Sequence, residues 1–229
     1  MKMKKLLSLA LAGALVCTGT ASVIAANASK QEMKLREANL FTDAVKGNED
    51  GFITKGEAVV LVLNALGYKE DVNIKEDYVK LNPFSDASAA YKGYLGLAYD
   101  LGLVQKADSF NENETAKEDY LLGLVLRALN YQDAFTDTEN LAVKQGLVDE
   151  SDYIEDDVTR EEAAEIILNS LNAELGDGTK TKFGEYLVRA GILSEDKLKA
   201  LGVKAALKDK EDIHIIYFND FHGNYRQEA

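Results

Sequence analysis

A fifteen-residue pattern occurs three times in this chain, and an internal repeat constrains a fold more than any single segment does. The copies span residues 54–68, 117–131 and 159–173, and they align without gaps at offsets of 63 and 105 residues. Apolar residues in each copy recur at three- and four-residue spacing, which buries one face of a helix. Each copy is therefore predicted to form a helix, and the three helices are expected to pack together because none can bury its apolar face alone.

Polar residues mark where these helices should begin. Thr54 and Thr159 can accept hydrogen bonds from the unpaired amides of a first helical turn. Glu57 and Glu162 follow three residues later, which is the spacing of a capping box. The first and third copies are therefore expected to have well-defined N-termini.

A shorter helix is predicted before the second and third copies. Residues 98–104 (Ala-x-x-x-Gly-Leu-Val) match residues 142–148, and the glycine suits the left-handed residue that ends a helix. A Phe-[Ser/Thr]-Asp signature stands at residues 84–86 and 135–137, ahead of each short helix. The same signature at residues 41–43 precedes the first copy, where the short helix is expected to be missing.

Together these motifs resemble the S-layer homology repeat, whose pattern continues with [Ile/Val]-Thr-Arg-x-Glu before the long helix. The third copy keeps that motif at residues 158–162, the first has Lys55 in place of the arginine, and the second departs from it at residues 116–120. The resemblance implies a mainly α fold, a pseudo-threefold bundle of helical repeats. The expected repeats are 40–82 (partial), 83–132 and 133–175.

In that family, grooves between the repeats hold secondary cell-wall polysaccharide, and the arginine of the Thr-Arg motif binds acidic groups of the glycan. A guanidinium suits a carboxylate because two parallel charge-assisted hydrogen bonds form. The resemblance therefore implies Arg160 as the first glycan-binding candidate, with Thr159 beside it, and Lys55 as the next. Tyr91 is a further candidate, unless it belongs to the core. Glu118 would repel an acidic glycan, so the groove of the second repeat is expected to be inactive.

Other interpretations of the same residues remain open. Arg160 can be a surface residue that pairs with a glutamate of its own helix. Residues 48–51 with Glu57 resemble part of an EF-hand calcium loop, although Lys46 stands where the first carboxylate ligand belongs. The whole module can also be a structural helical spacer whose repeats no longer bind glycan, as the degenerate second copy and the absence of tryptophan suggest.

The N-terminus predicts export. Three lysines precede the apolar run at residues 6–16, which is too short for a membrane span. Two small-residue cleavage sites follow, one near Ala25 and the preferred one ending at Ala28. Removing the signal peptide, residues 1–28, removes the only cysteine and leaves 23 basic against 39 acidic residues, a net charge of −16. Such a surface repels nucleic acid. We expect a secreted protein attached to the cell wall or S-layer, with no membrane span after cleavage.

The C-terminus changes character. Residues 213–218 predict a buried strand, and the Asn-Asp-Phe-His-Gly-Asn segment that follows resembles the opening motif of calcineurin-like metallophosphoesterases, closest to the 5'-nucleotidase branch. Asp220 and His222 match two ligands of that family's two-metal site. The family's other ligands are missing, because only seven residues follow His222.

We therefore expect a linker with short helices at residues 176–211 and the start of a truncated phosphoesterase domain at residues 212–229. This chain is expected to have no cofactor and no enzymatic activity. Its full-length parent is expected to be a metal-dependent phosphoesterase with two divalent metal ions, anchored to the cell surface by the repeats through secondary cell-wall polysaccharide or peptidoglycan.

Overall fold

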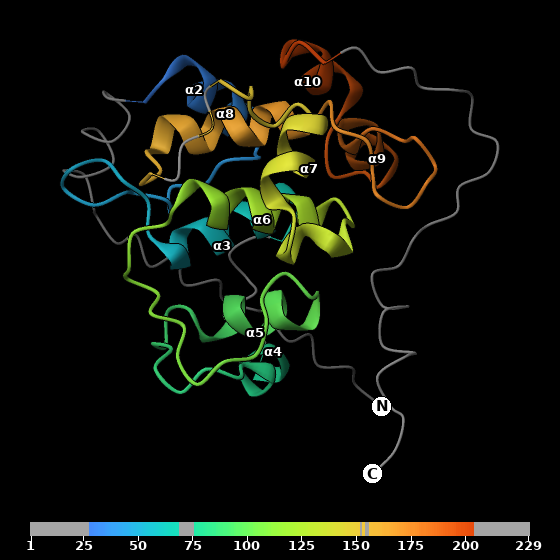
Figure 1. Ribbon diagram of the computed structural model, residues 1–229. Coiled ribbons are helices and arrows are strands. Elements are labelled where there is room, and N and C mark those ends of the chain that lie inside the picture. Colours follow the sequence, from blue (N-terminus) through green and yellow to red (C-terminus); the bar gives the residue numbers. More distant parts are fainter. Residues whose placement is uncertain (1–27, 69–75, 152, 154–155, 204–229) are drawn as a thin grey trace, which may run out of the picture.

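The computed structural model describes residues 28–68, 76–151, 153 and 156–203, which fold mainly into α-helices as predicted (Figure 1). The predicted signal peptide and strand, and the candidate metal ligands Asp220 and His222, lie outside the described residues. No helix in the described part is long and apolar enough to cross a membrane. The helices are α2 (Lys30–Glu37), α3 (Lys55–Ala65), α4 (Glu76–Leu81), α5 (Lys92–Asp100), α6 (Glu118–Ala128), the 3₁₀ helix η2 (Gln132–Phe135), α7 (Thr138–Lys144), α8 (Arg160–Ser170), α9 (Phe183–Arg189) and α10 (Glu195–Ala200).

The three sequence copies form the three longest of these helices, α3, α6 and α8, each of 11 residues. All three begin at the same position of the copy, so the predicted helices are confirmed. Leu61, Leu124 and Ile166 occupy equivalent positions along them and are buried. Equivalent apolar residues of the three copies thus contribute to one hydrophobic core.

Both predicted capping boxes are present. The Thr54 and Thr159 hydroxyls accept from the amides of Glu57 and Glu162, and each glutamate accepts in return from the amide of its threonine. Lys117, at the same position before α6, makes no side-chain cap.

Replacing Thr159 by alanine should therefore lower the free energy of unfolding by about 1 kcal/mol, the usual cost of losing such a cap. Lys117→Ala is the matched control and should change it by less than about 0.5 kcal/mol, because that position carries no cap. Urea unfolding of both variants tests this. Equal losses in the two variants would contradict the capping role.

The segments that lead into the long helices join in a closed ring. The Ile53 amide donates to the Val158 carbonyl, Val158 donates to Ala116, and Ala116 donates back to Ile53, each at 2.9 Å. These residues are separated by the repeat offsets, so equivalent backbone groups make equivalent bonds. The ring brings the N-termini of α3, α6 and α8 together.

No helix forms between residues 41–43 and the first copy, as expected, but the first copy does have a short helix: α2, which lies before that signature instead of after it. Two residues after the short helices α2, α5 and α7 stand left-handed residues, Asn39, Gly102 and Gly146, with φ of 63°, 71° and 67°. After each comes a leucine whose amide donates back into the last turn, as Leu40 does to the Leu35 carbonyl at 2.8 Å. The sequence motif required glycine there, but asparagine also tolerates the left-handed conformation.

Each short helix packs against the long helix of the preceding copy. α5 packs on α3, α7 packs on α6, and α2 packs on α8, which completes the cycle (Figure 1). The unit is therefore a short helix, a left-handed residue, a loop and a long helix, which is capped in the first and third units. Because α2 meets α8, the first and third units are neighbours in space.

The two short helices predicted between residues 183 and 203 are confirmed as α9 and α10. The sequence left open whether they cover the bundle or lead away from it. The Gly176 amide donates to the Leu129 carbonyl after α6, the Gly184 amide donates to Leu171 after α8, and the Ile192 side chain packs over Gly67 after α3. This segment therefore covers the C-terminal ends of all three long helices.

Candidate functional site

Two grooves lie at equivalent places in the repeat. The Lys55 groove, about 300 Å³ in volume, lies between the start of α3 and the side of α6. The Glu118 groove, about 470 Å³ in volume, lies between the start of α6 and the side of α8. Lys55 and Glu118 are the first residues of α3 and α6 and occupy equivalent positions of the repeat. The first groove therefore has a cation where the second has an anion.

Two cations line the Lys55 groove. The Lys55 ammonium forms an ion pair with Glu114 and lies 5.9 Å from the centre of the Tyr120 ring. The Arg127 Nε donates to the Leu103 carbonyl at 2.7 Å. Burial lowers the pKa of Arg127 to about 10, so its guanidinium still carries a positive charge at neutral pH. The groove therefore has one cation from α3 and one from α6, together with one carboxylate, that of Asp119 on α6.

Aromatic rings complete the Lys55 groove. Phe135 is 41% exposed, and its ring centre lies 4.2 Å from the Arg127 guanidinium carbon. The Tyr120 hydroxyl is buried and has no hydrogen-bond partner among the described residues. Burial raises the pKa of Tyr120, so the hydroxyl keeps its proton and remains a donor. A polar ligand that reached this hydroxyl would satisfy it.

The Glu118 groove has the opposite charge. Its described lining includes no lysine or arginine, and its six carboxylates come from Glu118, Asp149, Asp156, Asp157, Glu162 and Glu165. Lys117 lies beside it and pairs with Asp157 at 2.6 Å. A groove lined this way repels an anionic ligand.

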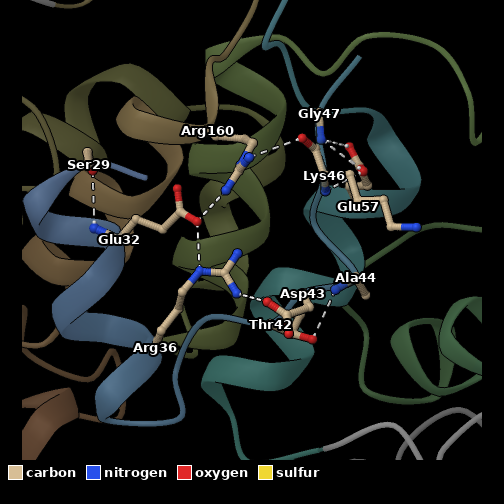
Figure 2. A network of polar contacts seen from close by, with 10 residues as sticks. All are labelled: Ser29, Glu32, Arg36, Thr42, Asp43, Ala44, Lys46, Gly47, Glu57 and Arg160. Carbon is tan, nitrogen blue, oxygen red and sulfur yellow. Dashed lines mark hydrogen bonds and ion pairs between the residues drawn. The ribbon is translucent and has the colours of Figure 1, made fainter. Parts of the chain in front are cut away.

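Arg160, the first glycan-binding candidate, lies in a network of polar contacts inside the protein (Figure 2). Its guanidinium forms an ion pair with Glu32 of α2, and the two side chains are 13% and 2% exposed. Arg36 donates to the same Glu32 oxygen at 2.7 Å and also pairs with Asp43. The surface interpretation placed the carboxylate partner of Arg160 in its own helix, α8. The structure places that partner, Glu32, on α2 instead.

The remaining two glycan-binding candidates have structural contacts. The Thr159 hydroxyl donates to the Glu162 carboxylate at 2.8 Å and also accepts from the Glu162 amide. Tyr91 packs against α3, where a Cβ added at Gly56 would lie 2.7 Å from the Tyr91 ring. Burial and the nearby Glu57 carboxylate raise the pKa of Tyr91. Neither Thr159 nor Tyr91 lines either groove.

The loop that resembles part of an EF-hand has other partners for its acceptors. The Glu57 carboxylate, which would be the terminal calcium ligand, accepts from the amides of Lys46, Gly47 and Thr54. The Asn48 side-chain oxygen accepts from two amides of the same loop. In the described residues, no group of three or more histidine, cysteine or acidic side chains could hold a metal ion.

The sequence interpretation missed Arg127. Its equivalents are Asn64 and Asn169, and each of those side chains donates to a backbone carbonyl near the end of a short helix. Arg127 likewise donates to a backbone carbonyl, that of Leu103, through Nε. Its guanidinium has two further nitrogens that the asparagines lack. An arginine where two other copies have asparagine was the available signal.

No protein-family model matches this chain, and neither a curated protein nor a solved structure matches it. Its function must therefore be inferred from the grooves and the sequence motifs.

Proposed function

We propose that this chain is an exported cell-wall-binding module that holds acidic secondary cell-wall polysaccharide in the Lys55 groove. The observation that carries the proposal is the joining of two cations, Lys55 and Arg127, with exposed aromatic surface in one groove. Cations recognise a carboxylate through charge-assisted hydrogen bonds, while apolar and aromatic walls exclude water from the rest of the ligand.

The fold supports the proposed relation to S-layer homology repeats. The closed ring of hydrogen bonds and the cyclic packing of short on long helices relate the three units as a pseudo-threefold bundle would. Within this arrangement, Lys55, Glu118 and Arg160 are equivalent. The Glu118 groove is acidic, and the partner of Arg160, Glu32, is only 2% exposed. The partner of Lys55, Glu114, is 57% exposed, so we assign the ligand contact to Lys55 in place of Arg160.

Co-sedimentation with purified cell-wall sacculi tests the proposal, before and after acid extraction of the secondary polymer. The chain should pellet with intact sacculi and stay in solution after extraction. Lys55→Ala and Arg127→Ala should each weaken retention by about tenfold or more, because a hydrogen bond to a charged group contributes about 1.5–3 kcal/mol. Lys144→Ala, which removes the same charge from an exposed site on α7, should retain full binding.

Arg160→Ala separates this assignment from the one made from the motif. We expect it to leave retention unchanged, because Arg160 lines neither the Lys55 groove nor the Glu118 groove. Retention that depends on Arg160 and ignores Lys55 would reverse the assignment. A folded chain that pellets with no sacculus preparation would leave the structural spacer as the function.

The anchored cargo is the second part of the proposal. The Asp220 and His222 motif supports a parent protein in which a 5'-nucleotidase-like metallophosphoesterase follows the repeats. That enzyme would bring two divalent metal ions to the cell surface, and the module described here would fix its place on the wall.

A further inference from the structure

Two guanidinium groups from different units converge on one buried carboxylate. Glu32 accepts from Arg36 of its own helix and from Arg160 of α8, 128 residues away in sequence (Figure 2). The Glu32 side chain is only 2% exposed. A carboxylate held by two guanidinium groups is the arrangement by which proteins also bind acidic ligands.

The equivalent positions in the other short helices differ. Counting back from the left-handed residue that ends each helix, Glu32 corresponds to Leu95 in α5 and Glu139 in α7, and Arg36 corresponds to Tyr99. Leu95 is fully buried and apolar, so α5 offers Lys55 no carboxylate, and Lys55 stays in its groove, where it pairs with the exposed Glu114. Glu32 therefore explains why Arg160 is withdrawn while the equivalent Lys55 is not.

Donor groups are left over around Glu32. The Arg160 Nε and the Arg36 Nη2 are buried and have no hydrogen-bond partner among the described residues. The Asp43 carboxylate and the Lys46 carbonyl accept from other nitrogens of these two arginines, and these two donors still stay unmatched.

We propose that Arg36 and Arg160 form a latent carboxylate-binding site and that Glu32 is its intramolecular occupant. The ligand class is an acidic saccharide, and this choice rests on the proposed function. The inference extends that function to the interface between the first and third units, where α2 packs on α8. Glu32 limits the module to one acidic glycan site, in the Lys55 groove. Removing the Glu32 carboxylate frees Arg160 to bind a second acidic group.

Arginine modification by phenylglyoxal, followed by mass spectrometry, measures the exposure of Arg160 in the full chain. In the unaltered protein, Arg160 should react at least about tenfold more slowly than the exposed Arg189, because modification requires local opening. Glu32→Gln should raise the rate at Arg160. Glu37→Gln, the same change at an exposed site of α2, should leave that rate as it was.

A second variant guards against loss of folding. Glu32→Leu alone gives α2 the apolar residue that α5 has at this position and keeps Arg36, so both guanidinium groups of the proposed site remain. In this variant, acidic polymer extracted from sacculi should protect Arg160 from phenylglyoxal, while a neutral glucan should not. Arg160→Ala in the same background should abolish the added polymer binding.

The outcomes separate this inference from the proposed function. If the unaltered chain binds the polymer and Arg160 of the variant stays unprotected, the latent site is refuted and the proposed function stands. If the unaltered chain binds no polymer and Arg160 of the variant is protected, the latent site stands and the Lys55 assignment fails. Arg160 that reacts as fast as Arg189 in the unaltered chain also refutes the inference.

Discussion

Replacing Gly96 with alanine should lower the free energy of unfolding by about 3 kcal/mol, at the upper end of what overpacking costs. A Cβ at Gly96 would lie 1.8 Å from the Tyr78 carbonyl oxygen of α4 and 3.1 Å from the Asn82 amide nitrogen. Both are backbone atoms, so no side chain can rotate away and α4 must leave its place on α5. The better helix propensity of alanine returns only about 1 kcal/mol.

Gly123→Ala is the matched control for this prediction. Gly123 also lies within a packed helix, α6. A Cβ added there would lie 2.9 Å from the guanidinium of Arg127, which can move aside. We expect this variant to unfold at nearly the same urea concentration as the unaltered chain. Similar losses in the two variants would mean that the contact between α4 and α5 is looser than described.

Glu32→Ala should lower the free energy of unfolding by about 3 kcal/mol, because it leaves the Arg160 guanidinium buried without a carboxylate and leaves Arg36 with only the exposed Asp43. Two arginines depend on this carboxylate, and their side chains are only 21% and 13% exposed. Glu37→Ala changes an exposed carboxylate of the same helix and should cost less than about 0.5 kcal/mol.

A double-mutant cycle assigns the loss to the network. Once Arg160 is replaced by alanine, the further change Glu32→Ala should cost clearly less than it does alone, because one of the two stranded charges is gone. Losses that simply add would show that Glu32 and Arg160 contribute independently. Urea unfolding followed by circular dichroism supplies all four free energies.

The sequence predicted local structure well. Three long helices, two capping boxes and the glycines that end α5 and α7 follow from short-range patterns, and each was found where the pattern placed it. α2 was missed because its terminal left-handed residue is Asn39 instead of glycine. Asparagine can adopt the same left-handed conformation, but the Ala-x-x-x-Gly motif does not include it.

The site was harder to predict, because its contacts join residues far apart in the chain. The acidic character of the groove at Glu118 followed from the motif, since a change of charge sign is visible in one position. The Glu32 and Arg160 pair did not follow, because nothing local indicates a partner 128 residues away. Arg127 was not predicted because it lies in the last turn of α6, outside the Thr-Arg motif at the start of the long helices.

The ring of hydrogen bonds between Ile53, Ala116 and Val158 also fixes how many units the module can have. An open array of repeats can gain or lose one unit at its end, because each unit contacts only its neighbours. Here the last unit binds the first, so deleting one unit would leave two open interfaces instead of a shorter array. The same closure delays folding: α2 is synthesised early, yet its partner α8 emerges only after most of the module, so the first unit must wait for the third.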